Sequence, residues 1–260
     1  MTIDTDAKDG YVKTEVHNNI LIIEFYHPQS NSLPSPLIAS LVHEIDSAAR
    51  NIDIHVIVLR AAGGGAFCAG ASFDELLTIE DEQQGAQFFN GFASIINAMR
   101  KCPKLIVARV HGKCVGGGVG LAAAADYTIA LEGADVKLSE LSIGIGPLVI
   151  GPAVERKIGL SAYSELAIDS TAWRSSDWAK RKGLYAGLHP TPESMDEAIA
   201  RLTSALAHTS PEAAAEMKKV FWHDTDHWDM LLQERAAISG KLVLSSYTKE
   251  CLRKFKEKKL

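Results

Sequence analysis

One glutamate and two glycine-rich segments contain the residue types best suited to chemistry. The first segment, residues 63–71, reads GGGAFCAGA, and the second, residues 116–120, reads GGGVG. Glycines let the backbone approach a ligand closely and leave its N–H groups accessible. If both segments face one point in space, their N–H groups can stabilise a single developing negative charge from two sides.

Glu140 follows the second segment and stands in the apolar stretch LSELSI, residues 138–143. Burial among Leu141, Ile143 and Leu148 favours the neutral carboxylic acid, which raises the pKa of the group toward neutrality. A carboxylate with such a pKa is a suitable general base near pH 7. The sequence therefore predicts proton transfer by Glu140 beside a site that stabilises an anion.

Strands and helices must hold these residues in place. Each glycine segment follows a short apolar run and leads into a stretch able to form a helix. The predicted strands are 12–15, 20–26, 54–59, 105–110 and 126–131, and the predicted helices of this part are 36–50 and 81–101. Strands that alternate with helices indicate an α/β core.

The last third of the chain has a helical pattern. Predicted helices cover 162–169, 175–182, 195–208, 211–222 and 231–255, the last with an interruption near Gly240. We divide the chain into a core, residues 1–190, and a C-terminal helical region, residues 191–260. Such a region commonly packs over a site or mediates contacts between subunits.

Composition limits the possible functions. The 260 residues are 47% hydrophobic and 23% charged, as in an ordinary globular protein. A net charge of −5 argues against a general role at nucleic acids or membrane surfaces. No apolar run has the ~18 residues of a membrane-spanning helix, and the polar N-terminus resembles neither a signal nor a transit peptide. The 4 cysteines lack metal-site spacing, so we expect a cytoplasmic protein with reduced thiols.

Glycine runs also occur in nucleotide-binding and hydrolase motifs, but the details here differ. A P-loop needs Ser or Thr after Gly-Lys, and residues 112–114 read GKC. A dinucleotide-binding turn needs a further glycine where residues 144–147 read GIGP. A serine-hydrolase elbow needs glycine two residues after Ser72, where Asp74 stands. We therefore disfavour all three motifs.

Three further features have structural as well as functional interpretations. His223 and His227 have a spacing that allows metal binding, but no third ligand is indicated and we predict no metal site. The basic tail at residues 253–259 fits either a solvated helix end or an anion site. Three phenylalanines at helical spacing fit the core better than an acyl pocket: Phe88, Phe89 and Phe92.

Several segments together resemble the crotonase superfamily, the enoyl-CoA hydratase/isomerase family. Residues 66–71 match its AFCAGA motif, the most specific of them. Residues 111–118 resemble NGxAxGGG, and residues 139–147 resemble PExxxGxxP. Weaker similarity lies at residues 28–33 and 250–258. The resemblance covers nearly the whole chain.

This resemblance implies a spiral of ββα units with C-terminal helices for trimerisation, assembled as trimers or dimers of trimers. It implies an acyl-CoA substrate of fatty acid metabolism, with coenzyme A as part of the substrate and no separate cofactor. The backbone N–H groups of Ala71 and Gly117 would form an oxyanion hole. Residues implied to contact the coenzyme A portion are Phe67, Ala69, Gly70, Gly116, Gly118 and Lys258. Of these, Phe67 and Ala69 would lie near the adenine, and Lys258 would meet the phosphates of a substrate bound to a neighbouring subunit.

One departure from the family pattern bears on the reaction. Hydratases of this family have a second glutamate where this chain has Gly120. A single carboxylate suffices to move a double bond, so isomerisation by Glu140 is our leading hypothesis. Hydration remains an alternative, with Asp74 or Glu75 as a second acid. Decarboxylation and a non-catalytic acyl-CoA-binding role are further alternatives.

Overall fold

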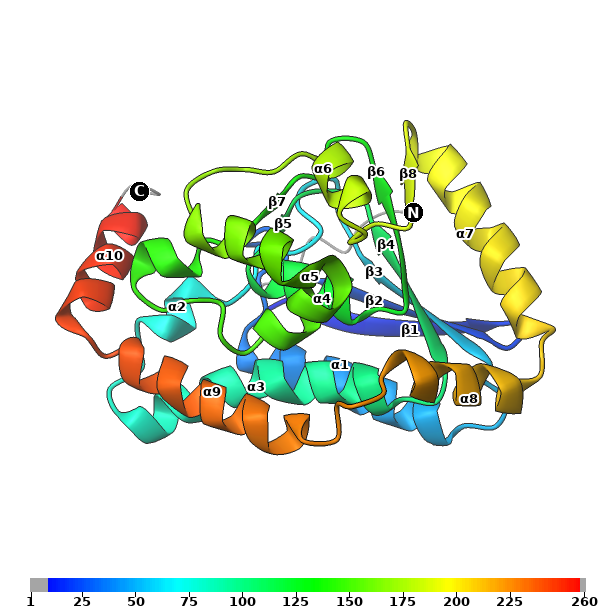
Figure 1. Ribbon diagram of the computed structural model, residues 1–260, viewed down its shortest axis with the longest axis horizontal. Coiled ribbons are helices and arrows are strands. Elements are labelled where there is room, and N and C mark those ends of the chain that lie inside the picture. Colours follow the sequence, from blue (N-terminus) through cyan, green and yellow to red (C-terminus); the bar gives the residue numbers. More distant parts are fainter. Residues whose placement is uncertain (1–8, 258–260) are drawn as a thin grey trace.

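Repeated units of strand, short extended segment and helix wind the chain into a spiral (Figure 1). The computed structural model describes residues 9–257. The main sheet has 6 strands in the order β1-β2-β3-β4-β6-β8. Their bounds are β1 Tyr11–His17, β2 Ile20–Tyr26, β3 Val56–Ala61, β4 Leu105–Val110, β6 Tyr127–Leu131 and β8 Gly187–His189. The α/β class and the spiral are therefore as the sequence predicts.

The direction of each strand follows from its connection. β1 and β2 are antiparallel, joined by the two-residue turn Asn18–Asn19, whose φ angles are 49° and 65°. Asparagine tolerates this left-handed conformation, which a tight hairpin requires. From β2 onward every neighbouring pair in the main sheet is parallel. Parallel strands need crossover segments, and these supply the helices of the spiral.

A second, smaller sheet brings the chemically interesting segments side by side. β5 (Cys114–Val115) pairs in parallel with β7 (Val136–Lys137). Isolated bridges extend this row from Leu33 to Ala71, from Cys68 to Cys114 and from Val136 to Arg174. Successive turns of the spiral thus place the glycine segments and the stretch before Glu140 in adjacent positions.

Helices cover the main sheet on both faces. The first group is α1 Ser35–Arg50, α2 Phe73–Leu76, α3 Glu82–Lys101, α4 Gly117–Ala124, η1 Glu140–Ile143 and α5 Gly151–Ile168. The second is α6 Ser176–Arg181, α7 Pro192–Ala207, α8 Pro211–Phe221, α9 Trp228–Leu242 and α10 Ser246–Glu257. The main core lies among the β-strands, α1, α3, α4 and α5, whereas α7 packs apolar side chains on the opposite face of the sheet. In Figure 1, α9 runs alongside α3.

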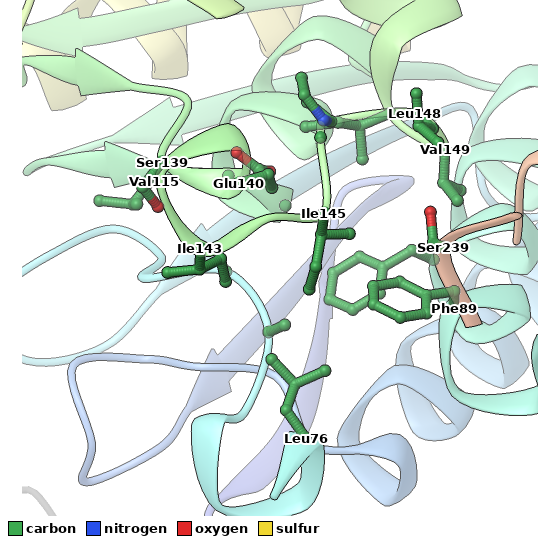
Figure 2. Close-up of a pocket in the computed structure, with 18 of the residues that line it drawn as sticks. Leu76, Phe89, Val115, Ser139, Glu140, Ile143, Ile145, Leu148, Val149 and Ser239 are labelled. Atoms are coloured by element: carbon green, nitrogen blue, oxygen red, sulfur yellow. The ribbon is translucent and has the colours of Figure 1, made fainter. Parts of the chain in front are cut away.

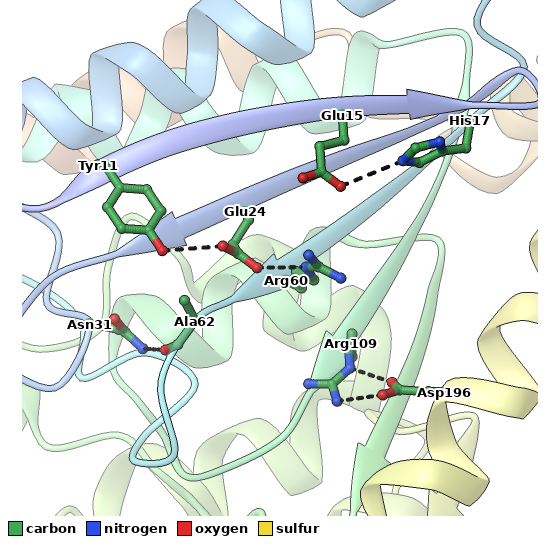
Figure 3. Close-up of polar contacts among 9 residues, drawn as sticks. All are labelled: Tyr11, Glu15, His17, Glu24, Asn31, Arg60, Ala62, Arg109 and Asp196. Carbon is green, nitrogen blue, oxygen red and sulfur yellow. Dashed lines mark hydrogen bonds and ion pairs between the residues drawn. The ribbon is translucent and has the colours of Figure 1, made fainter. Parts of the chain in front are cut away.

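Polar pairs lie on this opposite face of the sheet, and one of them joins the sheet to α7 (Figure 3). Glu24 accepts hydrogen bonds from Tyr11 Oη at 3.2 Å and Arg60 Nε at 2.8 Å. Arg109 of β4 donates two hydrogen bonds to Asp196 of α7. Every one of these carboxylates therefore has a cationic partner.

The predicted interruption near Gly240 is confirmed, since α9 ends at Leu242, and Gly240 itself lies in the last turn of α9. A Cβ atom on Gly85 of α3 would lie only 2.6 Å from the carbonyl oxygen of Gly240. The two helices therefore meet through their backbones, which requires glycine at both positions. The chain leaves the helix after Leu242 and enters α10 at Ser246.

α5 begins at Gly151, well before the predicted start at residue 162. Gly159 interrupts its helical geometry with a φ of 78°, which hides the periodicity of the first turns. No helix between residues 9 and 257 has the length and apolar character needed to cross a membrane.

Candidate active site

The two glycine segments meet in the structure. Gly70 has a φ of 83°, and a Cβ atom there would lie 2.8 Å from the carbonyl oxygen of Val115 and 3.1 Å from the nitrogen of Gly117. Any larger residue would push the segments apart. Glycine at position 70 is thus needed both for the backbone conformation and for the close approach of the segments.

Glu140 lies against the second segment. Gly116 has a φ of 52°, and a Cβ atom there would lie 2.7 Å from Glu140 Oε1. The hydrogen bond from the Gly116 N–H to the carbonyl oxygen of Lys137, 2.9 Å long, aligns the two strands. The structure therefore brings Gly70, Gly116, Gly117 and Glu140 to one place.

Two backbone N–H groups beside this carboxylate are available to a ligand. Gly117 is the first residue of α4, whose opening N–H groups have no acceptor inside the helix. Within residues 9–257, the N–H groups of Ala71 and Gly117 have no hydrogen-bond acceptor. Both residues line the same pocket. The N-terminus of α4 adds a partial positive charge at this point.

The pocket around Glu140 is mostly apolar (Figure 2). Its walls come from the first glycine segment, α2, α3, the second glycine segment, the loop after η1 and α9. The apolar side chains in it are Ala69, Ala71, Phe73, Leu76, Phe89, Phe92, Val115, Ile143, Ile145, Pro147, Leu148, Val149 and Ile150. Among the described residues that line it, Glu140 alone has an ionisable side chain.

This environment changes the acidity of Glu140. Burial raises its pKa from 4.5 to about 7, while its own backbone N–H acts weakly in the opposite direction. Its Oε2 atom is buried and has no hydrogen-bond partner among residues 9–257. The carboxyl group can therefore gain or lose a proton near neutral pH, as the sequence predicts.

Ile150 fills the space beside Gly120. A Cβ atom on Gly120 would lie 2.6 Å from Ile150 Cγ2. A glutamate at position 120 would require Ile150 to move. The side chain of Ile150 therefore occupies the space that an acidic side chain at position 120 would need. This contact joins two residues that are distant in sequence, and no local pattern indicates it.

Two of the three phenylalanines assigned to the core also form the pocket. Phe89 and Phe92 line it, and the Phe92 ring lies directly against the Cα atom of Gly117. Phe88 contributes to the core only. The core assignment is confirmed for all three, and Phe89 and Phe92 line the pocket as well.

Some residues expected to contact substrate do not line the pocket. The Phe67 side chain has 0% exposure and packs edge-on against Phe25, with 5.6 Å between ring centroids. Gly118 packs against Cys68, whose Cβ atom a side chain at 118 would approach within 2.8 Å. Both positions serve close packing beneath the site. Ala69, Gly70 and Gly116 do line it, and Lys258 lies outside the described residues.

The two candidates for a second acid have other partners. Glu75 accepts hydrogen bonds from the backbone N–H of Ser35, at 2.8 Å, and from its hydroxyl group, which caps the start of α1. Asp74 accepts a hydrogen bond from Gln29 Nε2 at 2.6 Å. Neither lines the pocket. The sequence suggests these residues through proximity along the chain, but their side chains are directed to α1 and its preceding loop.

No sequence pattern indicates the two hydroxyl-bearing residues of the pocket, Ser139 and Ser239. Ser139 directly precedes Glu140, whereas Ser239 comes from α9, far along the chain.

His223 and His227 lie in the turn between α8 and α9. Residues 9–257 contain no cluster of three or more side chains suited to hold a metal ion.

Comparison with known proteins connects this geometry to a family. A family model described as enoyl-CoA hydratase/isomerase matches residues 15–260. A protein of Bacillus subtilis named probable enoyl-CoA hydratase is 26% identical over 95% of this chain and 96% of its own. A peroxisomal Δ(3,5)-Δ(2,4)-dienoyl-CoA isomerase of Arabidopsis thaliana is 26% identical over 73% of this chain and 72% of its own. The crystal structure of enoyl-CoA hydratase from Bacillus halodurans has the same fold, with a TM-score of 0.87, 23% identity, and coverage of 94% and 99% of the two chains.

Proposed function

The chain belongs to the enoyl-CoA hydratase/isomerase family, and from this premise we propose that it moves a carbon–carbon double bond in an acyl-CoA thioester. The observation that supports this choice is that Glu140 is the one ionisable side chain among the described residues lining the pocket. Moving a double bond needs one group that removes a proton and returns it elsewhere. A single carboxylate with a pKa of about 7 meets that need.

In the proposed reaction, ionised Glu140 removes a proton from the α-carbon of a 3-enoyl thioester. The electron pair of that C–H bond moves toward the carbonyl group and leaves a dienolate. The protonated Glu140 then gives the same proton to the γ-carbon, and the double bond comes to lie between the α- and β-carbons. No other reactant is consumed.

The N–H groups of Ala71 and Gly117 would hold the thioester oxygen while its charge develops. One such donor is typically worth about 10²–10³ in rate. The N-terminus of α4 supports this role because its partial charge is positive. Phe92 lies against Gly117 and would exclude water from the same point.

Hydration is the second candidate, since the hydroxyl groups of Ser139 and Ser239 line the pocket and offer polar contacts to a water molecule. It is disfavoured because Ile150 fills the space next to Gly120. Water addition also needs a group to activate the water, and Asp74 and Glu75 have partners elsewhere.

The test follows both reactions with the purified protein. Incubation with 3-enoyl-CoA should produce the absorbance of a conjugated thioester, whereas incubation with crotonyl-CoA should leave that absorbance unchanged. Loss of crotonyl-CoA absorbance would instead establish hydration. Asp74→Asn is the matched control for the variant Glu140→Gln, because it removes a nearby carboxylate that does not line the pocket. Turnover of neither substrate, with thioester binding intact, would support a decarboxylase or a binding protein.

We also propose that the chain assembles as a homotrimer or a dimer of trimers. Exposed apolar side chains on its helices support this proposal: Leu160, Ile168, Met217, Val220, Phe221 and Met230. Light scattering coupled to size-exclusion chromatography would measure the mass. A monomer at micromolar concentration would contradict the proposal.

A further inference from the structure

A tryptophan is held by two lysines on the small sheet. The Nζ atoms of Lys113 and Lys137 lie 4.7 Å and 5.6 Å from the centroid of the Trp173 ring. The ring is 41% exposed, so this group is accessible from solvent. We call these three residues the basic–aromatic patch. Cation–π attraction keeps the lysines near the ring.

The patch shares one face of the small sheet with the pocket. Val115 and Ser139 each stand two residues after a patch lysine, and both line the pocket (Figure 2). The intervening residues Cys114 and Leu138 have 0% exposure and point into the core. Lys113 directly precedes β5 and Lys137 ends β7. Because side chains alternate along an extended chain, each lysine lies on the pocket side of the small sheet, about 7 Å before the lining residue.

The two patch strands are parallel, so both lead from the patch toward the pocket. The backbone N–H of Phe67 donates to the carbonyl oxygen of Lys113 at 3.0 Å, which places Lys113 level with the start of the AFCAGA segment. One molecule can therefore extend from Glu140 along this face to the patch.

The two lysines of the patch form no ion pair with any carboxylate in the described part of the chain. Within residues 9–257, no carboxylate lies within ion-pair distance of Lys113 or Lys137. The adjacent Arg174 is different, since Glu165 and Asp169 both pair with it at 2.9 Å. Two ammonium groups held around one ring repel each other, and an anion between them would relieve that repulsion.

We propose that the basic–aromatic patch binds an anionic group carried by the same thioester molecule whose reacting end occupies the pocket. This inference rests on the proposed function. Phosphate and carboxylate oxygens both accept charge-assisted hydrogen bonds from ammonium groups. The anion therefore belongs either to the nucleotide of coenzyme A or to a carboxylate at the far end of the acyl group.

Four unreactive thioesters separate these sources: butyryl-CoA, S-butyrylpantetheine, glutaryl-CoA and S-glutarylpantetheine. Isothermal titration calorimetry would measure their dissociation constants for the unaltered protein and for the double variant Lys113→Gln/Lys137→Gln. Lys182→Gln is the matched control, since Lys182 also lies over a tryptophan, 6.0 Å from the ring centroid of Trp178, but outside the pocket face.

We expect the double variant to bind butyryl-CoA about tenfold more weakly, with a smaller dependence on salt, if the phosphates occupy the patch. The loss would then be absent with S-butyrylpantetheine. If a carboxylate occupies the patch, the loss appears with S-glutarylpantetheine. The control variant should bind every thioester as the unaltered protein does.

Equal affinity of the double variant and the unaltered protein for all four thioesters would contradict anion binding by the patch. The proposed function would not be affected. A loss of the same size for all four, including the uncharged S-butyrylpantetheine, would also contradict anion binding by the patch, because the effect would then not depend on an anion. Failure of the unaltered protein to bind any thioester would overturn the proposed function, and the patch with it.

Discussion

The carboxyl groups at the two ends of α4 have opposite surroundings. At its N-terminal end, Glu140 lies beside Gly116 with one carboxylate oxygen unpartnered and its pKa raised to about 7. Just beyond its C-terminal end, the side chain of Asp126 is also enclosed, with 5% exposure. Its oxygens accept hydrogen bonds from Lys218 Nζ and the Ile106 N–H at 2.8 Å, and from Trp222 Nε1 at 3.1 Å.

This difference separates a structural carboxylate, Asp126, from the carboxylate that we propose is reactive, Glu140. A buried charge is tolerated when partners neutralise it, and it then joins elements of the fold. A buried carboxyl group without partners costs stability and keeps its proton near neutral pH, which is the property a catalytic base needs. Lys157 completes the paired end by donating to the carbonyl oxygens of Ala125 and Asp126 at 2.7 Å and 3.2 Å.

The largest expected effect is on activity at the unpaired end. Glu140→Gln should lower kcat for isomerisation by about 10³-fold, because general acid–base catalysis is typically worth about 10²–10⁴. Its stability should be equal to or greater than that of the unaltered protein. Steady-state kinetics and urea unfolding would measure both quantities. A kcat within tenfold of the unaltered value would contradict the role of Glu140.

At the paired end the effect should be on stability. Asp126→Asn leaves Lys218 buried without its counter-charge, and breaking such a pair typically costs about 3–5 kcal/mol. The free energy of unfolding should fall by about that amount while kcat of the folded protein changes little. Adding Lys218→Met should recover part of the loss. A single variant as stable as the unaltered protein would show that the pair contributes nothing.

The pH dependence of stability should contain a contribution from Glu140. Its pKa is higher in the folded protein, about 7, than its ordinary value of 4.5, so the folded state binds more protons between these values. The contribution of Glu140 to stability should therefore fall by about 3 kcal/mol as the pH rises from 4.5 to 7, and the proposed activity should rise through pH 7. Burial lowers the pKa of His111 to about 4, so His111 acts on stability in the opposite direction, and the difference between the unaltered protein and the Glu140→Gln variant isolates the contribution of Glu140. In Glu140→Gln this part of the stability change should disappear. An identical stability profile in the variant would place the titration elsewhere.

The smallest expected effect is on stability at the C-terminal end of α4. Lys157→Met removes hydrogen bonds to two carbonyl groups at the C-terminus of α4 and should cost about 1–2 kcal/mol. Activity should be unchanged because the other end of the helix is untouched. Thermal unfolding with a parallel kinetic assay would measure this. A fall in kcat would show that the two ends are coupled.

Local sequence signals suffice for much of the fold and for the centre of the site. The glycine segments follow strands with clear apolar patterns, and parallel strands bring the loops at their ends together, so their meeting with Glu140 can be predicted. β5 and β7 cannot, because two residues each give no periodicity. The start of α5 has one usable sign, Pro152 near its first position, but Gly159 masks the pattern that follows.

The features that the sequence does not predict depend on contacts between segments that are distant along the chain. Ile150 beside Gly120 and Ser35 beside Glu75 join residues whose neighbours in sequence say nothing of each other. The expectation of a second acid at Glu75 rests on its nearness to the first glycine segment, whereas its side chain caps α1. The position of Glu140 beside the glycine segments can thus be predicted from the sequence, but the side chains that surround it in the pocket cannot.

The backbone contact between Gly85 and Gly240 fixes the separation of α3 and α9. α3 contributes Phe89 and Phe92 to the pocket, and α9 contributes Ser239. A single methyl group at either glycine would act as a spacer and move one wall of the pocket relative to the other. Substitutions at these two positions can therefore change the width of the pocket, and with it the length of the proposed acyl group that fits, while every lining residue stays unaltered.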